Sequence, residues 1–148
     1  MLLRICRVFT RGLSLGVLPA LLTLALAACD DDPTAPASPV GTYEATSWTA
    51  TEGSTTTDVL EAGGSFTITL TSQGTTTGRV FVPASVTGEG DFDADLAGTW
   101  TQSGSTIDFD HEADTFVRDM LFTLQGSTLV GDRTFSGVRV QVTLARTP

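Results

Sequence analysis

The sequence predicts an all-β fold, an antiparallel up-and-down barrel of about eight strands formed from residue 40 onward. Three observations support this prediction. Several short runs alternate apolar and polar residues with a period of two, glycine-centred turn signals separate these runs, and no long segment has the 3.6-residue periodicity of an amphipathic helix. The length of 148 residues fits one domain.

The alternation is clearest in three segments, where apolar residues stand at every second position. These positions are Phe66, Ile68 and Leu70 in the first segment, Ile107 and Phe109 in the second, and Val138, Val140, Val142 and Leu144 in the third. A less regular stripe consists of Phe116, Met120, Phe122 and Leu124, with Arg118 inside it. Each pattern predicts a strand with one face in the core and the other in water.

Turn signals divide this region into the predicted strands. Similar glycine-containing turns occur at 72–75, 103–106 and 125–128, where glycine supplies a positive φ. The predicted strands cover residues 41–50, 64–71, 77–83, 94–102, 105–111, 115–124, 128–134 and 137–146. Loops are expected at 53–57 and 83–90, and a short helical turn at 58–62. A closed barrel is favoured over a sandwich because closure removes the exposed sheet edges. An eight-stranded interior either fills with side chains or holds one small ligand.

The first 28 residues have the three parts of an export signal. Three arginines lie within the first eleven residues, residues 12–29 carry no charge, and small residues precede Cys29. The apolar stretch 13–28 is short for a bilayer span of about 20 residues, and Pro19 interrupts it. An uncleaved anchor helix is therefore the second choice, after a cleaved signal peptide.

Residues Leu26-Ala27-Ala28-Cys29 resemble the lipobox of bacterial lipoproteins. The resemblance implies cleavage between Ala28 and Cys29, a diacylglycerol on the Cys29 thiol, and acyl chains such as palmitate that hold the chain to a membrane. The simpler alternative is a plain signal peptide with an incidental cysteine. The only other cysteine, Cys6, lies in the part that would be removed, so no internal disulfide is expected.

The lipobox divides the chain into a signal peptide (1–28), a lipidated cysteine with a disordered tether (29–39) and the barrel domain (40–148). We expect an exported protein that is lipid-anchored to the bacterial cell membrane or outer membrane, with its domain on the periplasmic or other extracytoplasmic side. The exported part keeps all 17 acidic residues and only five arginines, and the chain has no lysine. Such a surface repels phosphate backbones, which argues against a nucleic-acid partner.

Two short motifs carry a second resemblance. Val40-Gly41-Thr42-Tyr43 and Ala97-Gly98-Thr99-Trp100 are similar to the Gly-x-Trp opening and the inner Gly-Thr-Trp strand of small bacterial lipocalin-like lipoproteins. The first site has Tyr where that family usually has Trp. The resemblance implies a lipocalin-like barrel in which Tyr43 and Trp100 pack at the closed end.

The leading functional prediction is a membrane-anchored envelope lipoprotein that binds a small apolar or amphiphilic ligand inside its barrel, without a cofactor. Arg118, if it points inward, is expected to meet an anionic head group; the alternative is an ion pair with Asp119 or another acidic neighbour. Trp48 and Phe81 are further aromatic candidates whose facing the pattern does not assign. The other residues predicted to contact the ligand are Phe66, Ile68, Trp100, Phe109, Phe122 and Val140.

The alternative function is a non-enzymatic inhibitor, protein-binding or scaffold module with a filled barrel core. Its active element would be an exposed loop, with 83–90 as the first choice. An enzyme is not expected, because the predicted barrel domain, residues 40–148, has no Gly-x-Ser-x-Gly motif and only one histidine.

The acidic runs give only weak metal candidates. Asp91, Asp93 and Asp95 have the spacing that opens a calcium loop, but Leu96 and Gln102 stand where an EF-hand needs Gly and Glu. This excludes an EF-hand and leaves a looser calcium site open. His111 lies in a carboxylate-rich run, yet zinc sites usually draw on several His or Cys ligands. We therefore predict no metal site.

Overall fold

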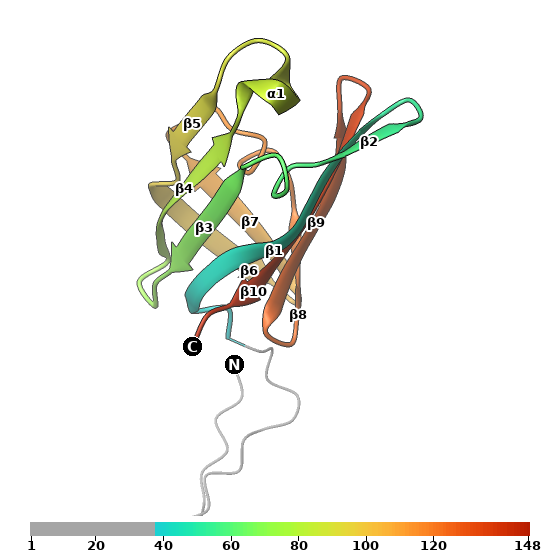
Figure 1. Cartoon of the computed structure of the whole chain (residues 1–148). Helices are drawn as coiled ribbons and strands as arrows, with labels where there is room; N and C mark the ends of the chain where they lie inside the picture. Colours follow the sequence, from blue (N-terminus) through green and yellow to red (C-terminus); the bar gives the residue numbers. More distant parts are fainter. Residues whose placement is uncertain (1–37) are drawn as a thin grey trace, which may run out of the picture. The chain divides into compact units, whose positions relative to one another are not determined.

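The computed structural model describes residues 38–148, and the predicted signal peptide, lipobox and most of the tether lie outside these described residues. The described part contains ten strands and one short helix (Figure 1). The strands are β1 (Gly41–Glu52), β2 (Thr55–Asp58), β3 (Ser65–Leu70), β4 (Thr75–Val82), β5 (Phe92–Asp95), β6 (Gly98–Ser103), β7 (Thr106–His111), β8 (Phe122–Gln125), β9 (Thr128–Phe135) and β10 (Val138–Arg146). The helix α1 spans Ala84–Thr87.

The strands close into one antiparallel barrel. Its order is β1-β3-β4-β6-β7-β8-β9-β10, and β10 pairs back onto β1 from Tyr43–Arg146 to Glu52–Val138. Each stave therefore pairs with the next one along the chain, and the last pairs with the first. The predicted all-β, up-and-down barrel of eight staves is confirmed, in agreement with the lipocalin-like plan.

Strand β1 is long enough to change partners. Its first residues, Gly41–Glu44, pair with β3, whereas Thr49–Glu52 pair with β2. An irregularity between Ala45 and Ser47 shifts the register against β10 and lets the strand curve. The prediction of a loop at 53–57 is thus wrong, because β2 extends the β1 hairpin. The short helical turn predicted at 58–62 is present: the Ala62 N–H donates to the Asp58 carbonyl at 3.2 Å, and the Asp58 carboxylate accepts N–H bonds from Leu60 and Glu61.

The predicted strand 94–102 consists of two strands, β5 and β6. β5 pairs with the second half of β4, whereas β6 pairs with Thr75 and Thr76 at the start of β4. Between them Leu96 turns fully into the core, and its N–H donates to the Gly78 carbonyl at 3.0 Å. A side chain at Gly98 would collide with the Asp110 carbonyl and lie 2.9 Å from His111 Cα. Glycine is therefore required where β6 begins.

The predicted strand 115–124 is wrong in its first part. Only β8 is extended, and residues 112–121, which we call the plug, form turns without strand pairing. Thr115, Val117 and Met120 of the plug are buried. Met120 packs against β9, because a Cβ built on Gly131 would lie 2.7 Å from Met120 Cε. β8 pairs only with the first two residues of β7, and the plug takes the place of further strand pairing between them.

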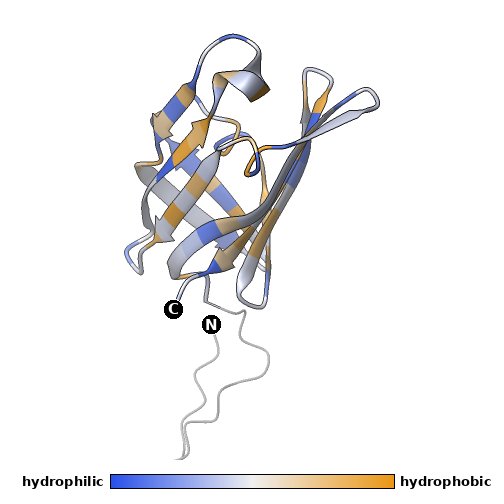
Figure 2. Cartoon of the chain, viewed as in Figure 1, coloured by the Kyte–Doolittle hydropathy of each residue, from blue (hydrophilic) through white to orange (hydrophobic). Residues whose placement is uncertain are grey.

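The centre of the barrel is filled by apolar side chains. The hydropathy pattern alternates along the strands, as expected for one buried and one wet face (Figure 2). Aromatic rings make edge contacts across the interior, with centroid separations of 6.0 Å for Trp48–Phe66, 6.4 Å for Phe66–Phe122 and 5.3 Å for Phe109–Phe122. Among residues 38–148, no helix is both long and apolar enough to cross a bilayer.

Candidate functional site

One end of the barrel is closed by paired polar groups. The Tyr43 hydroxyl donates to the Pro39 carbonyl at 2.9 Å and accepts from Arg146 Nη2 at 2.8 Å. The Arg146 guanidinium also lies over the Tyr43 ring, 5.4 Å from its centroid. Trp100 Nε1–H donates to the Thr71 carbonyl at 3.1 Å, next to the β3–β4 turn. We refer to this region as the closed end.

Trp100 is therefore a residue of the closed end, where the lipocalin-like resemblance placed it. Its inclusion among the predicted ligand contacts is not supported, because its indole group does not line the pocket described next. Its ring instead packs against the core from a half-buried position.

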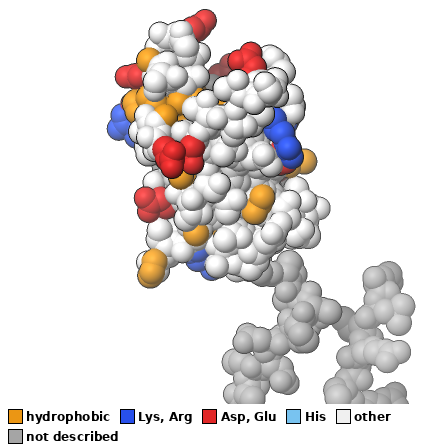
Figure 3. Space-filling model, turned by 45° about the vertical axis from the view of Figure 1, so that its right-hand side comes forward, with side chains coloured by type: hydrophobic (Ala, Val, Ile, Leu, Met, Phe, Trp, Pro, Cys, Tyr) orange, Lys and Arg blue, Asp and Glu red, His pale blue; other side chains and the backbone are white. Residues whose placement is uncertain are grey.

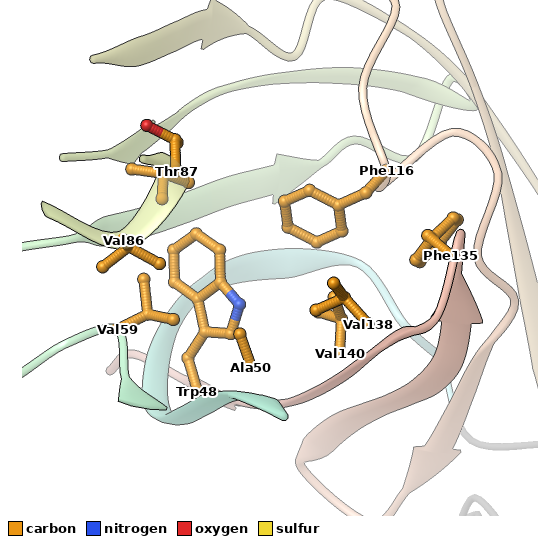
Figure 4. Close-up of a pocket in the computed structure, with 10 residues that line it drawn as sticks. Trp48, Ala50, Val59, Val86, Thr87, Phe116, Phe135, Val138 and Val140 are labelled. Carbon is orange, nitrogen blue, oxygen red and sulfur yellow. The ribbon is translucent and has the colours of Figure 1, made fainter. Parts of the chain in front are cut away.

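The opposite, open end contains an apolar pocket of about 270 Å³ (Figure 4). Its walls come from segments spread between residues 48 and 140: β1, the turn after β2, β4, α1, the plug, β9 and β10. The lining side chains are Trp48, Ala50, Val59, Val82, Val86, Thr87, Phe116, Phe135, Val138 and Val140. All but Thr87 are apolar, and the Thr87 hydroxyl already donates to the Gly90 carbonyl at 2.7 Å.

Trp48 lies between this pocket and the filled core. Its side chain is only 2% exposed, and its ring lies 5.5 Å from Phe116 and 6.0 Å from Phe66. Phe116 in turn contacts Phe135 at 6.5 Å, so the plug joins β1 to the β9–β10 hairpin. The indole nitrogen lies on the side of the ring that faces Val140 and Val138 (Figure 4). In the part of the chain that the structure describes, this N–H makes no hydrogen bond, and its nitrogen is not fully enclosed by the protein.

A second, more polar cavity of about 290 Å³ adjoins the apolar pocket. The two share Ala50, Val86, Thr87 and Val138, and the second adds Glu52, Thr55 and Thr57. Along the inward face of β1 the environment therefore changes from buried Trp48, through half-buried Ala50, to exposed Glu52. Acidic side chains lie near the α1 end of the barrel in the face shown in Figure 3.

The residues predicted to surround a ligand are mostly core residues. Phe66, Ile68, Phe109 and Phe122 are at most 2% exposed and do not line the pocket, whereas Val140 does. These four side chains belong instead to the packed apolar core of the barrel, where aromatic rings contact one another. The cavity lies at the open end instead.

Arg118 does not point into a cavity. Its guanidinium pairs with Asp114 and lies 3.5 Å from Asp119, both within the plug. This is the ion-pair alternative. Because residues 115–120 form turns, the even spacing to Phe116 and Met120 carries no information about facing. Phe81 stands opposite Ser65 and Asp93 on neighbouring strands and is also absent from the pocket.

Two pocket aromatics, Phe116 and Phe135, were not assigned to the site from the sequence, whereas Trp48 was a candidate whose facing the pattern left open. The alternation of Trp48, Ala50 and Glu52 carries a signal for its inward facing. Phe135 directly precedes the Ser136-Gly137 turn, and a residue next to a turn gives no periodicity to read.

The acidic candidates have structural partners. Asp93 accepts from Arg79 Nε at 2.7 Å, and this bond holds the pKa of Asp93 below its usual value. Asp91 accepts the backbone N–H of Ala84 at 2.7 Å, and Asp95 is exposed. Within residues 38–148, no group of three or more His, Cys, Asp or Glu side chains is placed to hold a metal ion.

His111 is buried at 2% exposure and stacks on Phe109 at a centroid distance of 5.4 Å. Neither ring nitrogen has a hydrogen-bond partner in the described structure. Burial lowers the pKa of His111, with a smaller opposing effect from Asp110. The ring is therefore buried within the barrel, and His111 is not among the residues that line the pocket.

No family model, curated protein or solved structure matches this chain. The lipoprotein and lipocalin-like resemblances therefore stay predictions from short motifs. The barrel and its pocket are supported by the structure alone.

Proposed function

We propose that this protein is a binding protein whose barrel takes the apolar part of a small molecule into the pocket at its open end. The observation that supports this most directly is the pocket itself: about 270 Å³ of space with nine apolar lining residues. An apolar cavity of roughly 150 Å³ is enough to hold benzene. Drug-sized ligands usually occupy pockets of about 300 Å³ or more. The pocket therefore suits one ring or a short branched chain.

The shape of the barrel supports uptake at the end and not in the middle. Below Trp48, the interior is packed, so a long lipid chain could not extend along the barrel axis. The adjoining polar cavity gives space for a second, hydrophilic part of the molecule near Glu52. The ligand class is thus a compact molecule with an apolar body and a polar end.

We test this function with benzene, which has no polar group. The full chain is titrated with benzene while NMR follows the two indole N–H signals. We expect the Trp48 signal to shift and saturate, whereas Trp100, at the closed end, stays fixed. An unchanged Trp48 signal, or equal shifts of both, would contradict the proposal.

A matched pair of variants controls for the site. Ala50→Leu adds volume inside the pocket and should abolish the Trp48 shift. Ala97→Leu makes the same change at an exposed position outside the pocket and should leave the titration unchanged.

The membrane attachment is a separate proposal that rests on the lipobox. In a bacterium fed labelled palmitate, the wild-type chain should take up label and sediment with membranes, because acylation at Cys29 supplies the anchor. Cys29→Ser should lose both the label and the sedimentation, while Cys6→Ser should keep them. Label on the Cys29→Ser protein would show that the anchor lies elsewhere.

A further inference from the structure

Within residues 38–148, the Trp48 indole N–H, which faces the pocket, has no hydrogen-bond partner. Buried tryptophan side chains usually place this donor on an acceptor. Trp100 follows that rule with the Thr71 carbonyl. Trp48 does not, although its side chain is far more buried than that of Trp100. A donor of this kind, facing a pocket, indicates where a ligand acceptor would bind.

Water is a poor substitute for that acceptor. A buried water molecule typically makes about three hydrogen bonds. In this pocket, the only other polar lining side chain is Thr87, whose hydroxyl donates to Gly90 and points away from the Trp48 ring (Figure 4). A water on Trp48 would therefore lack side-chain partners for its remaining bonds. A ligand atom that accepts the Trp48 bond can replace such a water without the loss of another side-chain hydrogen bond.

We propose that the ligand bears an uncharged hydrogen-bond acceptor, such as a carbonyl or ether oxygen, directly on its apolar body, and that Trp48 Nε1–H donates to it. This inference rests on the proposed function and specifies its ligand chemistry. A charged group is excluded at this depth because the apolar walls give it no counter-charge. A hydroxyl fits less well than a carbonyl, because its own proton would then find no acceptor among the lining side chains.

Three probes of nearly equal shape separate these chemistries. Acetophenone has an acceptor only, 1-phenylethanol has an acceptor and a donor, and α-methylstyrene has neither. Each is titrated into the full chain and followed by NMR. Acetophenone should shift the Trp48 indole proton signal downfield, as expected when that proton forms a hydrogen bond. α-Methylstyrene should not cause this downfield shift. The Trp100 signal stays fixed throughout.

Hydration differs between the probes, so the decisive quantity is a ratio compared between two proteins. Trp48→Phe keeps an aromatic ring but removes the N–H. The dissociation constant of α-methylstyrene divided by that of acetophenone should fall roughly three- to tenfold in this variant, the range expected for one hydrogen bond. The ratio for 1-phenylethanol should change less.

The outcomes are distinguishable. If neither acetophenone nor α-methylstyrene binds the wild-type protein, the proposed function itself fails. If both bind, but the ratio is the same in Trp48→Phe, the acceptor inference alone is overturned. Should Trp48→Phe not fold, the wild-type spectra decide: equal movement of the Trp48 proton with both probes overturns the inference, and a downfield movement with acetophenone alone supports it.

Discussion

The two ends of the barrel differ in whether their polar side chains have hydrogen-bond partners. At the closed end, the Tyr43 hydroxyl, the Arg146 guanidinium and the Trp100 indole all have partners within hydrogen-bond distance. At the open end, the Trp48 indole has none in the described structure, and apolar walls stand around empty space. The paired groups of the closed end are expected to contribute to stability, whereas the unsatisfied group at the open end is the one that we propose a ligand binds. Substitutions at each end can test this division.

The largest expected effect is at Gly98, where β6 turns into the barrel wall. Gly98→Ala should lower the free energy of unfolding by about 3 kcal/mol or more, because the new methyl group meets the backbone of Asp110 and His111. Gly90→Ala, in the loop after α1, has open space around its Cβ and should change stability by under about 0.5 kcal/mol. Urea unfolding of both variants measures the difference. Equal midpoints would remove Gly98 as a structural requirement.

The next effect concerns the Tyr43 hydroxyl. Tyr43→Phe removes the partner of both Pro39 and Arg146 in a fully buried position, which should cost about 1–2 kcal/mol in unfolding free energy. Ligand titrations at the open end should be unaffected. A loss of benzene binding in this variant would show that the two ends are coupled, contrary to the division between a stabilising closed end and a binding open end.

His111 is also without a hydrogen-bond partner in the described structure, but unlike the Trp48 indole it does not line the pocket. Since burial lowers the pKa of His111, the unfolded chain binds a proton at a higher pH than the folded chain does. Stability should therefore be greatest above about pH 6.5 and fall as the pH drops toward 5.

Denaturant unfolding at several pH values checks this expectation. His111→Phe should flatten the slope in that window, because Phe has no proton to bind. If the slope persists in His111→Phe, a group other than this histidine is responsible.

The smallest effect is expected at Arg139, which pairs with Asp132 on the outer face of the β9–β10 hairpin. Both side chains are exposed, and such pairs contribute little to stability. Arg139→Gln should leave both the unfolding midpoint and the benzene titration at the wild-type values. A clear loss of binding would assign the hairpin's outer surface a role that its geometry does not suggest.

The sequence was sufficient to predict the barrel but not its pocket. Period-two alternation and glycine turns identify staves such as β3, β7 and β10, because each has one buried and one wet face. The plug was misread because Phe116 and Met120 imitate that alternation, while the actual burial of Val117 and Met120 comes from turns. Whether Phe66 lines a cavity or fills a core depends on how closely rings from separate strands pack, and no local pattern carries that information.

The end of the barrel at which the chain enters determines where the tether is attached. Ser38 and Pro39 are held to the closed end, where their carbonyls accept bonds from Arg146 and Tyr43. If Cys29 carries the lipid, the intervening residues reach on the order of 30 Å at most when fully extended. The tether would then join the barrel at the end opposite the pocket, so the lipid and a bound molecule would be attached at opposite ends of the domain.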